Sequence, residues 1–524
     1  AAHASIGAGR ELVASLRCVN CHKSDAAVTG GMPELRQDAP NLSVAAERLR
    51  PQWLAYWISN PRSLRPDATM PRVLHDLPAG NAPAVDPRAQ DIAAYLTANA
   101  PAGGDDAASS DDSVVGRGGH LFTSLGCVAC HVAPAVEDSD ATLKRVPLKY
   151  VKAKYRPAGL VEFLKKPEAH YAWIRMPDFR LADDEATALA SFLLSRAKDD
   201  ALPANTLAAG DAAKGKQLFE SVGCMNCHTV EASGSPRPAM TIELSKADWS
   251  RGCAADDAAS IGKGVDFSFT ADQRAALRAF GPAHLADLSR DPPPEFAARQ
   301  MSALRCNACH SIDDRDNSWS NLDDEIQKIE QDLPAAEANG EQQVTDQSRP
   351  PLTWVGEKLH AGWMGKFIAG QVPYKPRQWI VARMPGFPAR AQGIANGFAM
   401  SHGFAPSESA EPPVDAKLAD VGRTLTSRTG FGCVACHGVG DQPPLAPFEA
   451  PSINFAHVTD RMRHDFFSRW IRHPQYYLPG TKMPQFSDAN GRTAYKNVLG
   501  GDASQQYEAI WQYLRAGDQI TPPQ

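Results

Sequence analysis

The chain has 524 residues, of which 22% are charged, and its formal net charge is −6 at pH 7. This length predicts several domains, and the acidic balance argues against nucleic acid as a partner. No apolar run reaches the roughly 18 residues of a membrane-spanning helix. The sequence begins Ala1-Ala2-His3 without a signal peptide, which we interpret as the start of a processed product.

One short motif, Cys-x-x-Cys-His, occurs five times and uses ten of the eleven cysteines. The cysteine pairs are Cys18 and Cys21, Cys127 and Cys130, Cys224 and Cys227, Cys306 and Cys309, and Cys433 and Cys436; the histidines are His22, His131, His228, His310 and His437. This motif is the attachment signature of haem c. Its two thiols add to the vinyl groups of the haem, and its histidine supplies the proximal nitrogen of the iron. The sequence therefore predicts five covalently bound haem c groups.

Other roles for paired cysteines fit less well. Structural zinc needs four nitrogen or sulfur ligands per site, whereas these pairs stand about a hundred residues apart, each with its own histidine. A thioredoxin-like redox pair needs a βαβ context, and no strand-rich pattern surrounds the motifs. A disulfide framework is typical of small secreted domains and leaves the repeated histidine unexplained.

The segments around the motifs repeat in a common order. Each motif follows a short amphipathic helical pattern, clearest at Gly118, Leu121, Phe122 and Leu125, and again at Gly215, Leu218, Phe219 and Val222. An aromatic-rich helical segment comes after the motif in four repeats, at 53–58, 160–164, 363–368 and 466–471. A Met-Pro pair then follows, beginning at Met70, Met176, Met384 and Met483. A last helix, such as 183–196 or 504–515, usually ends the repeat.

This order resembles class I cytochrome c domains, repeated along essentially the whole chain. The resemblance implies an all-α fold of five tandem domains, each around one covalently attached haem. It also implies that the methionine is the distal iron ligand. Histidine and methionine are 48, 45 and 46 residues apart in repeats one, two and five, and 74 apart in repeat four. Haem c is normally attached outside the bacterial cytoplasm, so the resemblance implies a periplasmic or exported protein.

We place the five domains at 1–101, 113–200, 208–290, 291–406 and 415–524. Flexible or stiff linkers are expected between them, at 101–112, 200–210, 291–294 and 407–415. The fourth domain carries an acidic insertion at 313–346. The insertion could dock a basic partner, but the charge pattern favours a solvated face.

Repeat two is basic where the insertion is acidic. Its cations are Lys144, Arg145, Lys149, Lys152, Lys154, Arg156, Lys165 and Lys166. This strip could steer an acidic redox partner or contact the haem propionates of another repeat, and the sequence does not separate these alternatives.

Repeat three departs from the pattern. When it is aligned with repeat two, Gly264 stands where the distal methionine is expected. The same repeat holds Cys253, the eleventh cysteine. We expect the Cys253 sulfur to be the distal ligand of the third haem, the one on His228. The alternatives are an inert buried thiol, with Met240, His284 or an open coordination position at the iron.

A haem with histidine and methionine in both axial positions has no place for a substrate, so it exchanges only electrons. The sequence therefore predicts an electron carrier, or the cytochrome subunit of an oxidoreductase, with no catalytic residue of its own. Its partners would be a dehydrogenase donor and a cytochrome or oxidase acceptor. The alternative is an enzyme whose chemistry occurs at the third haem, because His/Cys ligation is similar to that of some thiosulfate-oxidising cytochromes. Ligand exchange at Cys253 would give a sensor instead.

Overall fold

The computed structural model describes residues 2–24, 31–75, 85–98, 108–203, 209–230, 242–333, 347–408 and 410–523. The protein is mostly helical, with 52% helix and 5% strand, which confirms the expected all-α class. In the described part of the chain, no helix combines the length and apolar character needed to cross a membrane. Two compact units are present: unit 1 comprises the described residues of 1–291 and 319–338, and unit 2 those of 292–318 and 339–524.

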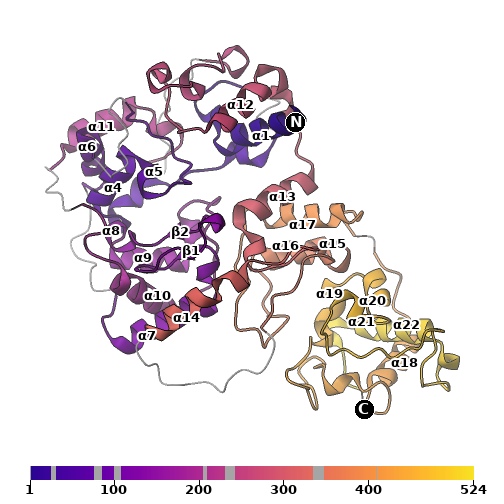
Figure 1. Cartoon of the computed structure of the whole chain (residues 1–524). Helices are drawn as coiled ribbons and strands as arrows, with labels where there is room; N and C mark the ends of the chain where they lie inside the picture. Colours follow the sequence, from indigo (N-terminus) through magenta and orange to yellow (C-terminus); the bar gives the residue numbers. More distant parts are fainter. Residues whose placement is uncertain are drawn as a thin grey trace. The chain divides into compact units, whose positions relative to one another are not determined.

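The helices of both units are shown in Figure 1. In unit 1 the α-helices are α1 (Ala2–Ser15), α3 (Ala45–Arg48), α4 (Pro51–Ser59), α5 (Pro61–Leu64), α6 (Pro87–Leu96), α7 (Asp112–Ser124), α8 (Val151–Lys154), α9 (Pro157–Lys165), α10 (Asp183–Arg196), α11 (Ala212–Ser221), α12 (Ala271–Phe280) and α14 (Asp323–Gln331). In unit 2 they are α13 (Pro293–Leu304), α15 (Val355–Lys358), α16 (Ala361–Ile368), α17 (Ala391–Ser401), α18 (Ala416–Thr426), α19 (Val458–Arg461), α20 (His464–Trp470), α21 (Pro474–Tyr477) and α22 (Ala503–Leu514). The strands β1 (His131–Val132) and β2 (Val146–Pro147) form a short parallel pair.

The helix before each motif crosses a helix that follows a Met-Pro or equivalent segment. These pairs are α7 with α10, α13 with α17, α18 with α22, α1 with α12, and α11 with α6. A glycine lies at each crossing: Gly118, Gly397, Gly422, Gly9 and Gly215. A Cβ at any of these glycines would overlap the backbone of the partner helix, so the close approach requires glycine. Repeats one and three use the same type of crossing as the others.

Two of these five crossings pair helices from different repeats, which the sequence did not predict. Helix α1 of repeat one packs on α12 of repeat three, and α11 of repeat three packs on α6 of repeat one (Figure 1). We call residues 2–24, 31–38 and 242–290 the His22 body. We call residues 39–75, 85–98 and 209–230 the His228 body. The expected boundaries 1–101 and 208–290 therefore do not describe these two bodies, because the repeats have exchanged their halves.

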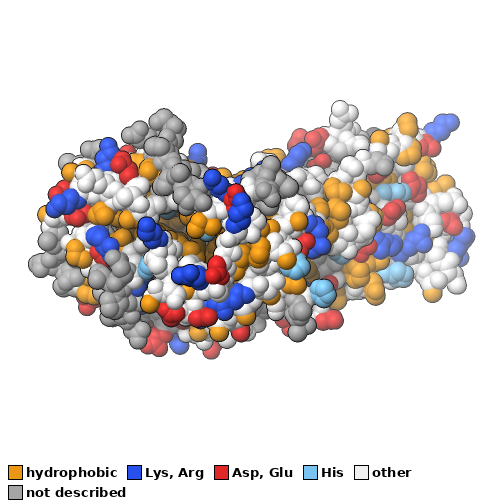
Figure 2. Space-filling model, turned by 90° about the horizontal axis from the view of Figure 1, so that it is seen from above, with side chains coloured by type: hydrophobic (Ala, Val, Ile, Leu, Met, Phe, Trp, Pro, Cys, Tyr) orange, Lys and Arg blue, Asp and Glu red, His pale blue; other side chains and the backbone are white. Residues whose placement is uncertain are grey.

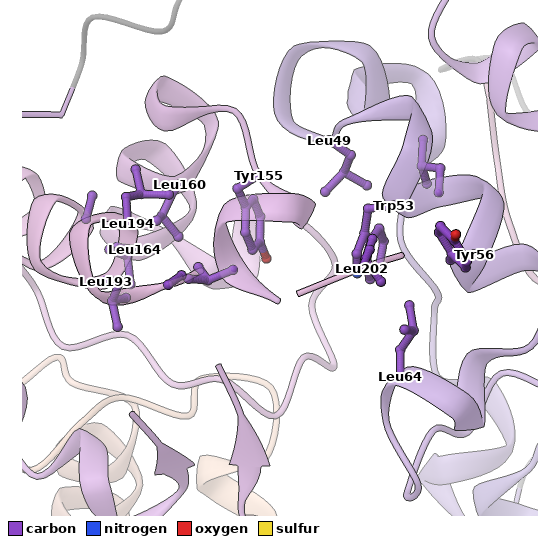
Figure 3. Close-up of a cluster of buried hydrophobic side chains, with 14 of the residues drawn as sticks. Leu49, Trp53, Tyr56, Leu64, Tyr155, Leu160, Leu164, Leu193, Leu194 and Leu202 are labelled. Atoms are coloured by element: carbon purple, nitrogen blue, oxygen red, sulfur yellow. The ribbon is translucent and has the colours of Figure 1, made fainter. Parts of the chain in front are cut away.

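The cores support the exchange. In the His22 body, Val13 of α1 and Leu35 are buried in one cluster with Leu277, Phe280 and Leu288. In the His228 body, the rings of Tyr95 in α6 and Phe219 in α11 lie 5.8 Å apart between centroids. A larger apolar cluster, which continues into repeat two, includes Leu49, Trp53, Tyr155 and Leu160 (Figure 3). Because both halves of each body contribute buried side chains, the exchanged arrangement has a continuous core.

The acidic insertion is mostly exposed where it is described, but one of its carboxylates is buried. The carboxylate of Glu325 in α14 receives two hydrogen bonds from the Arg145 guanidinium of repeat two, at 2.9 and 2.7 Å. Both side chains are almost fully buried, with 0% and 1% of their surface exposed. Leu322 and Ile329 are buried on the same side. The expected solvation holds for Asp323 and Asp324, which are exposed. It fails for Glu325, because this carboxylate and the apolar side of α14 meet a complementary surface. Residues 334–346 of the insertion lie outside the described residues.

Two of the expected linkers prove to contain helix starts. The Asp111 and Asp415 carboxylates accept hydrogen bonds from the first backbone N–H groups of α7 and α18, as N-cap residues do. The proline run after Asp291 does not form a separate break, because Pro293 begins α13 and its fixed φ suits the first turn of a helix. Residues 101–107, 204–208 and 409 lie outside the described residues.

Candidate haem sites

All five Cys-x-x-Cys-His motifs have the same local conformation. A residue with left-handed φ precedes each motif: Arg17, Gly126, Gly223, Arg305 and Gly432. The first three residues of each motif form a 3₁₀ turn: Cys18–Asn20, Cys127–Ala129, Cys224–Asn226, Cys306–Ala308 and Cys433–Ala435. The N–H of the second cysteine donates to the carbonyl of the first at 3.1–3.2 Å in every copy. Side chains three residues apart eclipse each other in such a turn, so both thiols of a motif lie on one side.

The thiols occupy apolar surroundings. Burial raises the pKa of Cys18, Cys127, Cys224 and Cys433 to about 12 each. None of the eleven cysteines, all of which are described, forms a disulfide. The first cysteine of these motifs is therefore a neutral, apolar group, and its environment suits a thioether sulfur at the edge of a haem.

Three of the motif histidines are oriented by a backbone carbonyl. The Nδ1 atom of His228 lies 2.8 Å from the Pro40 carbonyl, that of His310 lies 2.7 Å from Pro350, and that of His437 lies 2.7 Å from Ile453. A carbonyl only accepts, so Nδ1 carries the proton and Nε2 keeps its lone pair. Burial lowers the pKa of all three imidazoles, partly offset by these carbonyls. A neutral, fixed imidazole with a free Nε2 is what an iron ligand requires.

The exchange extends to the motif contacts. His228 of repeat three is held by Pro40 of repeat one, and the Leu42 N–H of repeat one donates to the Thr229 carbonyl at 2.8 Å. In the reciprocal direction, the Lys23 N–H donates to the Ile242 carbonyl at 3.0 Å, and the Leu244 N–H donates to the Lys23 carbonyl at 3.0 Å. The first motif is therefore contacted by a segment of repeat three, and the third motif by a segment of repeat one.

Each methionine expected as a distal ligand can be assigned to a part of the structure. Met70 lies in the His228 body, where the Trp57 indole N–H donates to its sulfur at 3.1 Å. Met176 packs against the same core as Cys127, and Met483 against the same core as Cys433. Met384 is half-buried between α16 and α17. The 48-residue spacing from His22 to Met70 is therefore not the spacing of one ligand pair, because these residues belong to different bodies.

Cys253 lies beside the first motif, not the third. It neighbours both Cys18 and Cys21, whose raised pKa values, mainly due to burial, it raises further. The expectation that Cys253 faces the third motif is corrected by the exchange, since the segment 242–290 packs on the first motif. Gly264 lies directly against the backbone of Cys253, and the Val265 N–H lies 3.4 Å from the Cys253 sulfur. Gly264, which stands where the methionine was expected, and the additional cysteine, Cys253, are therefore neighbours.

The other ligand candidates in repeat three, which lacks the expected methionine, are His284 and Met240. His284 interacts with Asp287 through Nδ1, at 3.1 Å. Met240 lies outside the described residues. Among the described side chains, no group of three or more His, Cys, Asp or Glu residues gathers as a metal cluster.

The two exchanged motifs also touch each other. The amide of Asn20 donates toward the Cys227 sulfur at 3.4 Å. Behind them, Arg72 and Asp266 pair as an antiparallel bridge, with hydrogen bonds of 2.8 and 3.0 Å. The two sites of these bodies are therefore neighbours in unit 1.

Sequence patterns did not reveal the carbonyl partners of the histidines or the exchange. The segments Pro40-Asn41-Leu42 and Pro350-Pro351-Leu352 carry a weak shared signal, a proline two residues before a leucine. No pattern in the sequence indicates which motif each segment serves.

No family model, curated protein or solved structure matches this chain.

Proposed function

We propose that this chain is a five-haem c-type cytochrome that transfers electrons, built from class I cytochrome c-like bodies. The observation that carries the proposal is the fivefold recurrence of Cys-x-x-Cys-His in one local conformation, each copy following a helix that takes part in a glycine-dependent crossing. Independent copies of an accidental motif would not share both the left-handed residue and the crossing helix.

Bound haem supplies an iron that accepts and donates one electron at a time. The chain holds each group covalently through two thiols and offers a neutral histidine nitrogen on one side. Met70, Met176, Met384 and Met483 are proposed as distal ligands of the centres on His228, His131, His310 and His437. Leucine, phenylalanine and tryptophan side chains are buried in the clusters against which Cys127 and Cys433 pack, and they would shield a bound haem from water.

For the centre on His22 we propose Cys253 as the distal ligand. A thiolate donates electron density and favours the ferric state, so this centre would have the lowest potential of the five. That arrangement fits an entry point for electrons next to the His228 centre, whose motif touches it.

A second function is favoured by the same residue. A labile Cys253 would leave the His22 centre open to a small sulfur-containing substrate, and the protein would then be a redox enzyme. The carrier is preferred because the other four bodies carry a complete set of proposed ligands.

The proposed partners are redox proteins, with a dehydrogenase as donor and a cytochrome or oxidase as acceptor, in the periplasm or outside the cell. On the face shown in Figure 2, acidic and basic side chains are interspersed with apolar ones. Such a mixed surface suits brief encounters with partners of either charge rather than one strongly steered complex.

Mass spectrometry of the mature protein tests the cofactor content. Five added haem masses are expected, and fewer would contradict the proposed architecture. Turnover of thiosulfate by the isolated protein would favour the enzyme over the carrier.

Electron paramagnetic resonance tests the ligand pairing. A low-spin thiolate signal is expected in the oxidised protein and should disappear in Cys253→Ser. It should also disappear in the double variant Cys18→Ala/Cys21→Ala and remain in the matched variant Cys224→Ala/Cys227→Ala. Retention in the first double variant and loss in the second would return Cys253 to the His228 centre.

A further inference from the structure

In two places, two Cys-x-x-Cys-His bodies are joined by the same short antiparallel bridge, and we call each of these places a junction. In unit 1, the Arg50 N–H donates to the Lys154 carbonyl at 2.9 Å, and the Arg156 N–H donates to the Arg48 carbonyl at 2.8 Å. These bonds flank an antiparallel bridge between Leu49 and Tyr155, whose side chains are both labelled in Figure 3. The first junction thus joins the His228 body to repeat two through matching segments.

The second junction lies in unit 2 and repeats this geometry. The His360 N–H donates to the Arg461 carbonyl at 2.9 Å, and the Arg463 N–H donates to the Lys358 carbonyl at 3.0 Å. Leu359 and Met462 form the antiparallel bridge between them. The junction between repeats four and five therefore has the same geometry as the junction between the His228 body and repeat two.

Each junction contains cations that lack anionic partners. Arg48, Lys154, Lys358 and Arg461 each end a short helix, namely α3, α8, α15 and α19. No carboxylate among the described residues lies within ion-pair distance of any of the four. Arg461 is only 7% exposed, and its Nε has no hydrogen-bond partner. The Nε and Nη2 atoms of Arg48 are also buried without partners.

The neighbours of these groups are aromatic or cationic. The Lys154 ammonium lies 4.8 Å from the centre of the Trp53 ring across the first junction, and the Lys358 ammonium lies 5.1 Å from that of Trp470 across the second. Burial, with nearby arginines, lowers the pKa of Lys154 and of Lys358 to about 7 each. Burial, Arg48 and Lys154 together lower the pKa of His170 to about 3. Buried charges need a counter-charge. Among the described carboxylates, Glu47 interacts with Arg48 only through space, and no carboxylate forms an ion pair with any of the four cations.

The fifth body provides an internal comparison. Its corresponding short 3₁₀ turn, Leu244–Lys246, also ends in a cation, but no second body joins it through such a bridge in the described residues. Lys246 is exposed and pairs with Glu243 at 2.7 Å. A cation at this position is therefore left without an ion-pair partner only where a second body joins the same segment through an antiparallel bridge.

We propose that the Arg48–Lys154 and Lys358–Arg461 junctions bind the carboxylates of the haem groups, which pairs the His228 centre with the His131 centre and the His310 centre with the His437 centre. This inference rests on the proposed haem content. Bound haem groups would supply a one-electron couple on each side of a junction, and the junction cations would hold their carboxylates; transfer of one electron between two such groups would make and break no bond. The His22 centre has no partner of this kind and reaches the His228 centre through the Asn20–Cys227 contact.

The carboxylates could instead belong to a soluble anion. Haem carboxylates are favoured because both junctions connect two bodies that each carry a Cys-x-x-Cys-His motif, and because the body without a junction has no unpaired cation at this position. Only a soluble anion would make the haem potentials depend on the choice of buffer anion, and the experiments below include this comparison.

Spectroelectrochemical titration of the full-length holoprotein tests the proposal. Lys154→Met and Lys358→Met keep an apolar stem and remove the charge, and each should raise the Fe(III)/Fe(II) ratio of two centres about tenfold at a fixed potential. The conservative variants Lys154→Arg and Lys358→Arg should restore the wild-type ratio. Lys246→Met is the matched control and should leave all five centres unchanged. An equal shift in the control, or no shift in either junction variant, would overturn the pairing.

A second measurement does not depend on the lysine variants. Removal of one haem by Cys127→Ala/Cys130→Ala should shift the potential of the His228 centre and leave the His310 and His437 centres unchanged. No change in any remaining centre would contradict the first pair. Potentials that follow the choice of phosphate or chloride buffer would assign the junctions to a soluble anion and overturn the proposal. A wild-type haem content below five would instead refute the proposed function itself.

Discussion

Repeat five and the His22 body contain the same motif in the same conformation, but their chains are arranged differently. In repeat five, α18 and α22 come from one continuous segment and cross at Gly422. In the His22 body, α1 and α12 are separated by more than 250 residues and cross at Gly9 in the same way. The comparison shows that the crossing, and not chain continuity, defines a body of this fold. Distant segments, including α14 on repeat two, therefore pack into unit 1 beside neighbouring ones.

The largest expected effect concerns the contact of α14. Glu325→Ala leaves the Arg145 guanidinium buried without its main counter-charge, which should lower the free energy of unfolding of unit 1 by about 3–5 kcal/mol. Chemical denaturation followed by circular dichroism measures this. The control Glu243→Ala removes an exposed pair with Lys246 and should have no measurable effect. Equal stability of the two variants would mean that the α14 contact adds nothing to unit 1.

A smaller effect is expected where the His228 body meets repeat two. Asp67 pairs with Arg65 at 2.7 Å and with Arg175 at 3.2 Å. Burial opposes the ionisation of Asp67, but the two arginines outweigh it and lower its pKa from 3.8 to about 2. Because the folded-state pKa is lower than the unfolded one, the pairing stabilises the fold above pH 4, and this contribution is lost as the pH falls toward 2.

Asp67→Asn should therefore cost about 1–2 kcal/mol at pH 7, after allowance for solvent screening. The difference from the wild type should stay constant between pH 5 and 8 and shrink below pH 4. Urea titrations across this range measure it. A difference that grows on acidification would show that another group is responsible.

A similar or slightly smaller effect is expected at the start of the last motif. Gly432 has φ of +74°, and no atom lies within 4 Å of the position that a Cβ would occupy, so Gly432→Ala incurs only the left-handed conformational penalty. The expected loss is about 1–2 kcal/mol in unit 2, measured by thermal unfolding. Gly7→Ala is the opposite control, because Gly7 lies in α1 with open space around it, and alanine should stabilise a helix there. Destabilisation in both variants would point to packing rather than backbone conformation.

The smallest effect gives the sharpest test of the exchange. The Tyr95 and Phe219 rings lie 5.8 Å apart across two repeats, and the Phe122 and Phe192 rings lie 5.7 Å apart within one repeat. Double-mutant cycles to alanine should give a coupling energy of about 0.5–1.5 kcal/mol for both pairs. Coupling for the second pair alone would mean that α11 does not pack on α6 in solution.

Much of the candidate site was readable from local sequence. The two thiols and the histidine of each motif lie within five consecutive residues, so their spacing alone places them together. Helices 183–196 and 504–515 were expected nearly where α10 and α22 lie, because their apolar periodicity and capping residues are local signals. The Gly264 gap and the additional Cys253 were also visible, since they depend only on alignment of one repeat with another.

The sequence by itself determined the helices, the five motifs and the residue types that face them. Only the tertiary structure decided which halves combine: Cys253 with His22, Met70 with His228, Glu325 with Arg145, and the unpaired cations at two junctions. The physical reason is that repeats one and three offer equivalent apolar faces and glycine crossings, so local patterns fit either pairing. The choice between them depends on contacts between residues hundreds of positions apart, which no local pattern encodes.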